Sequence, residues 1–437
     1  MFPYYLELAL RSLRRNAVLT ALMIAAIGVG IGASMTTLTV FRAMSGDPIP
    51  AKSRQLFTPQ IQNRGPDHPD QESEDGLPTS ISYIDAMAWM RAGVGKRQTA
   101  TYATWLSVRP ADPKQKPFKK GVRVAYNDFF TMFEVPFQYG GAWTRADDDN
   151  RAAVVVLTRA INDSLFGGAN SVGKTIRLDN ETYRVVGVLK EWLPIPRFYD
   201  LQNVPFGESD QLLIPFTRAI DRQMTVSGSM SCTDESGAAF SDLLKSNCIW
   251  MQFWVELPTH DDVAKYRAYL ANYAADQQHS GRFGWVPRTQ LRDVREWLAY
   301  RHVVPNEVNI LILLSFGFLS VCLLNAAGLM LAKLMGRAGE IGVRRALGAS
   351  RMTIFVQCLI ETGVVGLSGG LLGLGLTMLG LAAARALVGA DFVALMHLDV
   401  ADVGIAIGLS LTATLLAGLY PTWRAAQVQP AWQLKAP

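Results

Sequence analysis

Four long apolar runs constrain this chain more than any other feature of its sequence. Residues 17–41 and 308–332 contain no Asp, Glu, Lys or Arg. A third apolar run covers residues 352–385, and a fourth covers residues 403–423. A helix needs about 20 mostly apolar residues to cross the hydrocarbon core of a bilayer. With 49% hydrophobic and 18% charged residues in 437, the sequence predicts a membrane protein with four transmembrane helices.

The charges beside these runs predict an orientation. Lys and Arg flank the start of the first run, the loop between the second and third runs, and the chain's end, whereas residues 391–402 are acidic. Because basic loops stay in the cytoplasm, both termini are expected there and the polar insert outside. This placement of basic residues, and the formal net charge of +5, fit membrane orientation better than nucleic-acid binding.

The expected division of the chain follows from these runs. It comprises a cytoplasmic interfacial helix (1–16), transmembrane helix 1 (17–44), an extracytoplasmic domain (45–305), transmembrane helix 2 (306–333), a cytoplasmic loop (334–351), transmembrane helix 3 (352–385), an outer loop (386–402), transmembrane helix 4 (403–423) and a cytoplasmic tail (424–437).

The polar insert mixes strand and helix patterns and is expected to be an α+β domain. Strands are predicted at 100–108, 121–125, 154–157, 175–178, 183–189 and 250–257, and helices at 82–90, 158–166 and 260–277. Asp179 and Asn180 are predicted to turn a hairpin. Asp147 to Asp149 are expected to form an exposed acidic turn.

The loop between the second and third runs contains the sequence EIGVRRALGAS at 340–350. Glu340 and Arg344 are four residues apart and can pair on one face of a helix. Val343, Ala346 and Leu347 form a small apolar face, and Gly348 is expected to end the helix. Such a helix can dock on a partner or lie on the membrane; the alternative is an ordinary positive-inside loop.

Residues 337–350 resemble the cytoplasmic loop of the FtsX/MacB superfamily of ABC-transporter permeases. The insert, with NDFF, GGAW and VVVLTRAINDSLFGG, resembles the periplasmic core domain of MacB-like members, and residues 291–302 resemble their helical stalk. The resemblance implies a bacterial inner-membrane permease without its own ATPase domain. Its coupling residues would be Glu340, Ile341, Gly342, Val343, Arg344, Arg345, Ala346, Leu347 and Gly348.

The resemblance also implies partners. These are a separate cytoplasmic ATPase that binds ATP and Mg, a second identical or paralogous permease subunit, and a periplasmic adaptor with an outer-membrane channel. The implied function is ATP-driven movement of the outer domain that exports or extracts a peptide, drug, siderophore or lipoprotein. The alternatives are an FtsX-like signalling subunit that activates a cell-wall hydrolase, and a membrane-anchored outer-surface enzyme.

The cysteines and two pairs of glycines each carry a further prediction. Cys232 and Cys248 are expected to form a disulfide if the insert lies in an oxidising compartment, whereas Cys322 and Cys358 are expected to stay free. The pairs Gly28 with Gly32 and Gly366 with Gly370 are GxxxG patterns that allow close helix packing, within the bundle or across a dimer.

Glu361 lies inside the third run and is expected to have a structural or coupling role, with proton transport as the alternative. Residues 168–175 match GxxxxGK[ST], but a helix is predicted before them and a strand after them, which is the reverse of a P-loop. The five scattered histidines and the lack of an HExxH or GxSxG motif predict neither a metal site nor a hydrolase site.

Overall fold

The computed structural model describes residues 15–65, 73, 75–110, 116–203, 205–206, 210–233, 237, 239–388 and 400–427, with the side chains of 385–388 left out. The chain forms two compact units. The helical unit comprises Met1–Ser45 and Val304–Pro437, and the insert domain comprises Gly46–Val303. Residues 1–14 of the expected interfacial helix at 1–16, and most of the outer loop at 386–402, lie outside the described residues.

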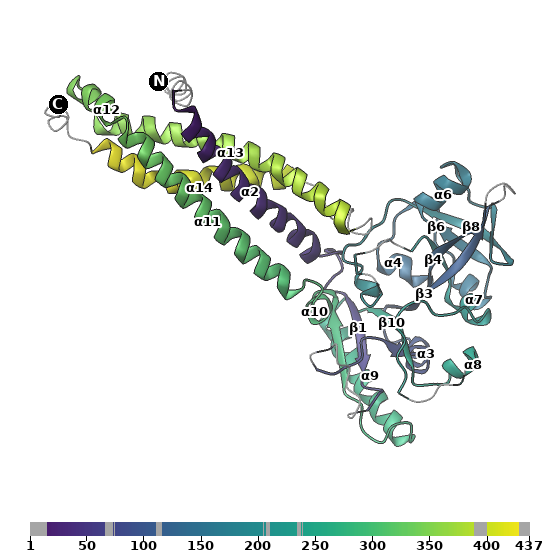
Figure 1. Cartoon of the computed structure of the whole chain (residues 1–437). Helices are drawn as coiled ribbons and strands as arrows, with labels where there is room; N and C mark the ends of the chain where they lie inside the picture. Colours follow the sequence, from purple (N-terminus) through teal and green to yellow (C-terminus); the bar gives the residue numbers. More distant parts are fainter. Residues whose placement is uncertain are drawn as a thin grey trace. The chain divides into compact units, whose positions relative to one another are not determined.

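Among the described residues, four helices of the helical unit are long and apolar enough to cross a membrane, as the sequence predicts. They are α2 (Ala17–Ser45), α11 (Asn306–Met335), α13 (Arg351–Val388) and α14 (Val400–Ala426). Helix α2 contacts both α11 and α13, and α13 also contacts α14. A short helix, α12 (Ala338–Ala346), lies at the end of the bundle where α2 starts and α14 ends (Figure 1).

The insert domain is an α/β domain between the first and second of these long helices, which confirms the expected fold class. Its strands are β1 (Leu56–Ile61), β2 (Ile81–Ser82), β3 (Arg97–Arg109), β4 (Phe118–Ala125), β5 (Phe137–Gly140), β6 (Val154–Leu157), β7 (Thr175–Leu178), β8 (Glu181–Leu189), β9 (Leu212–Pro215), β10 (Ile249–Glu256) and β11 (Thr289–Asp293). Its helices are α3 (Tyr83–Ala92), α4 (Asp128–Met132), α5 (Arg145–Asp149), α6 (Arg159–Phe166), η1 (Phe198–Asp200), α7 (Phe216–Asp221), α8 (Phe240–Leu243), α9 (His260–His279) and α10 (Val294–Tyr300).

Six strands of this domain close into a ring. Each pairs with the next in the order β3, β4, β9, β6, β8, β7, and β7 pairs again with β3. The β6–β8 and β4–β9 pairs are parallel and the other pairs are antiparallel. The side chains of Val108, Val122, Val155, Val185 and Leu212 belong to the buried apolar cluster. Closure leaves no free edge within the ring. Buried and exposed positions alternate along β7, whereas every residue of β6 and β9 is buried.

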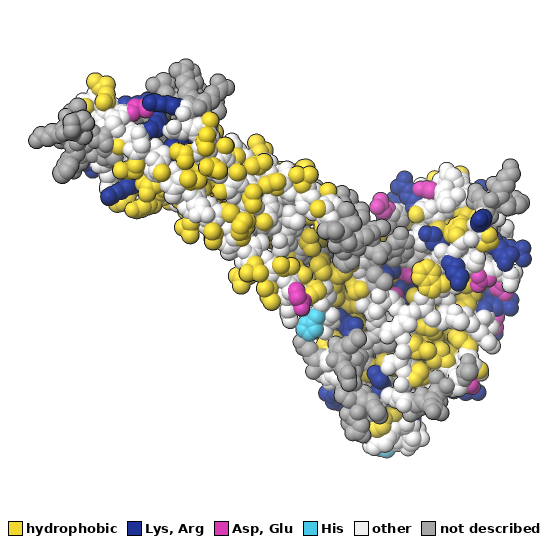
Figure 2. Space-filling view, in the orientation of Figure 1, with side chains coloured by type: hydrophobic (Ala, Val, Ile, Leu, Met, Phe, Trp, Pro, Cys, Tyr) yellow, Lys and Arg dark blue, Asp and Glu magenta, His cyan; other side chains and the backbone are white. Residues whose placement is uncertain are grey.

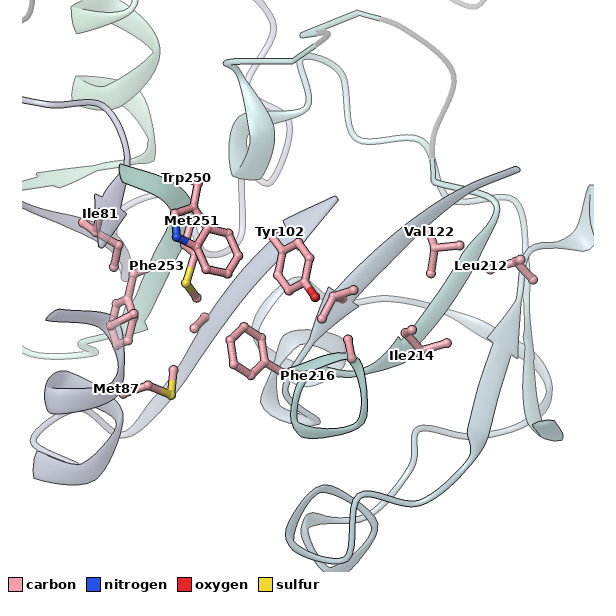
Figure 3. Close-up of a cluster of buried hydrophobic side chains, with 14 of the residues drawn as sticks. Ile81, Met87, Tyr102, Val122, Leu212, Ile214, Phe216, Trp250, Met251 and Phe253 are labelled. Atoms are coloured by element: carbon pink, nitrogen blue, oxygen red, sulfur yellow. The ribbon is translucent and has the colours of Figure 1, made fainter. Parts of the chain in front are cut away.

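Beyond the ring, the sheet continues from β3 through β10 and β1 to β11. Aromatic side chains fill the core beside β3 and β10 (Figure 3). Tyr102 meets Trp250 edge to face with ring centroids 5.0 Å apart, and Phe216 likewise at 5.9 Å. Edge-to-face aromatic contacts add about 0.5–1.5 kcal/mol each beyond the apolar area they bury.

Two predictions for the insert are wrong. Residues 291–302 do not form one helical stalk, because residues through Asp293 belong to β11, which pairs with β1. Helix α10 begins only afterwards, with a capping box between Asp293 and Glu296. The acidic residues Asp147–Asp149 are not simply an exposed turn: they lie in α5, and Asp148 is buried.

Candidate functional site

Helix α12 ends where the sequence predicts. The amide of Leu347 donates to the carbonyl of Val343 (3.0 Å), and Gly348 follows with φ +99°. This left-handed conformation strains any residue with a Cβ atom, so glycine suits the turn into α13.

The two faces of α12 have opposite surroundings. Ala338, Ile341 and Gly342 are buried, and Ile341 belongs to the apolar cluster inside the bundle. Val343 is 56% exposed and Leu347 is 83% exposed, with Ala346 exposed between them. One face therefore anchors the helix to the bundle, and the other presents apolar side chains outward.

Glu340 fixes the polar edge of α12. Its carboxylate accepts from Arg344 (2.7 Å), as the four-residue spacing predicts, from Arg337 (3.4 Å) and from Arg15, two residues before α2 (3.3 Å). Partial burial by itself raises the pKa of Glu340. The hydrogen bond and the charge of Arg337 outweigh this effect, so that the pKa of Glu340 lies below its usual value. Arg344 also donates to Gln357 of α13 (3.2 Å). Arg344 is thus tied to the bundle rather than free at the rim of a docking surface.

A second carboxylate lies deeper in the bundle. Glu361 of α13 pairs with Lys333 of α11 at 2.6 Å, and the two side chains are 2% and 0% exposed. Arg337 also reaches Glu361 (3.3 Å), and Lys333 donates to Thr20 of α2 (3.3 Å). An ion in an apolar environment is costly unless it is paired. The pairing therefore accounts for an acid within an apolar helix.

Together these contacts form one polar network. Arg337 bridges Glu340 of α12 and Glu361 of α13, and Lys333 extends the network to α11 and α2. Because hydrogen-bonded ion pairs in a low-dielectric interior are directional and strong, the network ties α12 to three of the four long helices.

The predicted GxxxG glycines lie at helix contacts within this chain. A Cβ atom on Gly28 would come within 2.8 Å of Leu372, and one on Gly32 within 2.8 Å of Leu376, both on α13. A Cβ on Gly366 would similarly meet Thr414 of α14 at 2.9 Å, and one on Gly370 would meet Ser410 at 3.0 Å. These four glycines thus allow close packing inside the bundle.

In the insert domain, the structure joins Cys232 to Cys248 with an S–S distance of 2.01 Å. This bond ties the segment before Cys232 to the start of β10. Cys322 and Cys358 are buried free thiols of the helical unit.

The P-loop-like residues 168–175 follow α6 and lead into β7, which is the reverse of the strand–loop–helix order that phosphate binding requires. Within the described residues, no group of three or more His, Cys, Asp or Glu side chains could hold a metal ion.

Three residues in or beside the polar network, Lys333, Thr20 and Gln357, are not predicted from the sequence. Lys333 is predicted only as one of the basic residues that flank the apolar runs. The available signal was a lysine directly after one apolar run together with an acid inside the next. That combination indicates a buried ion pair if the two helices are neighbours.

Comparison with known families covers most of the chain. Residues 20–273 match the MacB-like periplasmic core domain, and residues 312–430 match the FtsX-like permease C-terminal domain. The first match covers the insert domain as far as residue 273, and the second covers Lys333, Arg337, Glu340 and Glu361 of the polar network.

Individual relatives are distant. The macrolide export ATP-binding/permease protein MacB of Syntrophobacter fumaroxidans is 25% identical over 355 residues, which cover 70% of this chain and 46% of that protein. The protein of the same name from Salmonella paratyphi A is 25% identical over 426 residues, covering 97% of this chain and 57% of that protein. The chain thus spans about half the length of the curated relatives it matches.

The crystal structure of the periplasmic region of MacB from Actinobacillus actinomycetemcomitans aligns with a TM-score of 0.35 and 16% identity, covering 56% of this chain and 92% of that one. The family matches, which span most of the chain, together with four apolar helices and the domain inserted after the first, assign the protein to the MacB/FtsX superfamily of ABC-transporter permeases.

Proposed function

We propose that this chain is the permease subunit of an ABC transporter in which α12 docks on a separate cytoplasmic ATPase. The observation that carries the proposal is the two-faced anchoring of α12. Its inner face and polar edge are fixed to the bundle, while Val343, Ala346 and Leu347 point outward. Exposed apolar groups on a fixed helix suit burial in a partner's groove.

The polar network supplies a physical route for coupling. A force applied to α12 passes through Arg337 and Glu361 to α13, and through Lys333 to α11. Helices α2 and α11 join the insert domain directly at its two chain connections. ATP and Mg²⁺ bound by the ATPase would thus move the insert domain without binding to this chain.

The wider assembly also belongs to the proposal. A second permease subunit would complete the transporter, and a periplasmic adaptor with an outer-membrane channel would receive the substrate. The names of the relatives refer to macrolide export. We include peptides, drugs, siderophores and lipoproteins as substrate classes for this chain.

The test is docking of an ABC ATPase subunit from the same genome, measured by co-purification and by permease-stimulated ATP hydrolysis. Val343→Asp with Leu347→Asp would bury unpaired carboxylates in the contact. A cost of at least about 3 kcal/mol weakens binding more than about a hundredfold. The matched control is Met335→Asp, which adds a carboxylate at a 48% exposed position at the end of α11.

We expect the control to keep both co-purification and stimulated hydrolysis. Wild-type docking by the double variant would reject α12 as the coupling element. If the wild type docks on the ATPase and stimulates hydrolysis but moves no substrate, the result would instead favour an FtsX-like signalling subunit.

A further inference from the structure

One outer surface of the strand ring carries an exposed tryptophan among cations. The register pairs Trp105 with Gly121, Ser107 with Lys119, and Arg109 with Arg177 across β4, β3 and β7. These positions alternate with the buried residues Leu106 and Val108, so they face away from the core. The basic strip is defined here as Trp105, Arg109, Lys119 and Arg177, all of which are exposed.

Trp105 is held in place although its side chain is 58% exposed. Its indole N–H donates to the hydroxyl of Ser227, and its ring lies 4.0 Å from the Cβ position of Gly121 on the neighbouring strand. Ser227 belongs to the segment that Cys232 ties to β10. A large apolar ring with its polar atom already satisfied and its position fixed loses little entropy when a partner covers it.

In the part of the chain that the structure describes, the cations of the basic strip have no acidic partner. Among the described residues, no carboxylate forms an ion pair with Arg109, Lys119 or Arg177; Arg109 reaches only the amide oxygen of Asn180 at 3.4 Å. The carboxylate of Asp179, nearby in the sequence, accepts instead from the backbone amide of Ser107 (2.8 Å). By contrast, Arg151, Arg218 and Arg222 of the same domain are paired with Asp221 and Glu181.

The position of two arginines also indicates that this surface binds an anionic group. Arg109 and Arg177 are directly opposite each other on antiparallel strands. Like charges in this arrangement destabilise a sheet by up to about 1 kcal/mol. Figure 2 shows Lys and Arg side chains, with apolar surface and some Asp and Glu side chains among them, over the part of the domain where Figure 1 places β3, β4 and β8. An anionic group bound here would relieve the repulsion.

The spacing of these groups indicates the size of the ligand. Trp105 and Arg109 are four residues apart on one strand, or about 13 Å at roughly 3.3 Å per residue. The cations follow strands instead of converging on one point, so the basic strip does not form a pocket for a single phosphate. Arginine and tryptophan side chains on a flat surface are typical of protein interfaces, in which they often supply most of the binding energy.

We infer that the basic strip is a docking surface for an acidic face of a second protein in the same compartment as the insert domain. The aromatic ring of Trp105 would be the buried anchor. Arg109, Lys119 and Arg177 would select a partner of opposite charge and speed its association. This inference does not depend on ATPase docking by α12.

The test uses the full chain in detergent and a short fluorescein-labelled poly-glutamate peptide, with binding followed by fluorescence anisotropy. Arg109→Glu with Lys119→Glu should weaken binding at least about tenfold. The matched control, Lys190→Glu with Lys245→Glu, makes the same change in net charge at two exposed lysines of the same domain. The control should lose less than about twofold, and Trp105→Ala should lose several-fold while Trp105→Phe keeps most of the affinity.

A single variant separates binding from folding. Arg109→Glu places an acid opposite Arg177, so it should keep or slightly raise the thermal stability of the insert domain while it weakens peptide binding. Equal losses in the strip and control variants would overturn the inference, since binding would then follow net charge alone. The inference would also fail if phosphatidylglycerol vesicles, and not the peptide, bind in a way that depends on the strip.

Discussion

Lys333 and Glu361 show how a charge is tolerated inside the bundle. Each ion is almost wholly buried, and each is the other's nearest charged partner at 2.6 Å. The attraction offsets desolvation only while both members are present. Arg337 gives Glu361 a second partner, whereas within the described residues Lys333 has only the hydroxyl of Thr20 in addition.

This asymmetry predicts unequal mutational effects. Glu361→Leu leaves a buried lysine without a carboxylate and should lower the free energy of unfolding by about 3–5 kcal/mol. Lys333→Met should cost less, because Arg337 still pairs with Glu361. The double variant should recover much of the loss. Thermal unfolding of the four proteins in one detergent checks this, and additive losses in the double variant would contradict it.

Asp148 of the insert domain titrates abnormally. Burial raises its pKa from 3.8 to about 7, although the amide of Asn127 (2.8 Å) and the indole N–H of Trp143 (3.0 Å) both donate to its carboxylate. The neighbouring acids Asp149 and Asp128 raise the pKa further. The folded protein therefore holds a proton at a pH at which the unfolded chain has released it.

The raised pKa of Asp148 makes the folded protein less stable as the pH rises. The stabilisation from protonated Asp148 is complete below its ordinary pKa of 3.8 and is lost as the pH rises to about 7. Asp148→Asn removes this titration. The stability of the wild type relative to the variant should therefore fall by up to a few kcal/mol over that window and stay constant at higher pH. A constant difference across the window in chemical denaturation would show that Asp148 has an ordinary pKa.

Sequence reasoning identified Glu361 but not its partner, for a physical reason. An acid within an apolar run is visible in one dimension, because its neighbours along the chain are all apolar. Lys333 lies beyond the preceding run and reaches Glu361 only because α11 and α13 pack at that depth. Buried Asp148 was missed similarly, since the sequence shows three acids together but not the fold that covers the middle one.

Helix α12 uses one residue to hold it against the bundle and another to face a partner. Ile341 is 7% exposed and Leu347 is 83% exposed on the same short helix. Ile341→Ala should lower the free energy of unfolding by about 2–4 kcal/mol, as other large-to-small core changes do, and should speed amide exchange in α12. Leu347→Ala should leave both unchanged and weaken only ATPase docking. Exchange measured by mass spectrometry distinguishes the two variants, and faster exchange in Leu347→Ala would show that Leu347 is an anchor.

Elements with strong local signals were predicted well. The hairpin of β7 and β8 has its turn at Asp179, whose φ of 49° suits the Asp-Asn turn of the sequence. The prediction of a helical stalk at 291–302 is wrong at its start, because the strand conformation of β11 depends on pairing with β1, more than 200 residues earlier. Closure of the ring through β3 and β7 was likewise not foreseen, since no local pattern reports which strands become neighbours.

For the whole molecule, the basic residues near α12 and the chain ends predict a topology. Reporter fusions after Arg337 and after Asp149 should report opposite sides of the membrane, with Arg337 in the cytoplasm. The start of α2, α12 and the end of α14 lie at one end of the bundle, which fits this expectation (Figure 1). Two fusions on the same side would refute the four-span arrangement.

The compartment of the insert domain also determines whether its two cysteines form a disulfide. We predict that Cys232 and Cys248 are joined in protein from intact cells, because disulfides persist outside the cytoplasm. Mass spectrometry of unreduced peptides should detect the linked pair, while Cys322 and Cys358 should react with a thiol reagent only after denaturation. Free thiols at Cys232 and Cys248 would contradict the prediction.

The closed strand ring has a consequence for biosynthesis. Strand β4 pairs with β9, about ninety residues later in the chain, and β3 pairs with β10 later still. During secretion the apolar strand β6 would therefore emerge before β9, one of its two neighbours in the ring. Long-range pairing of this kind is slow and leaves strands open to aggregation. The nascent insert would need protection by a chaperone until its last strands have crossed the membrane.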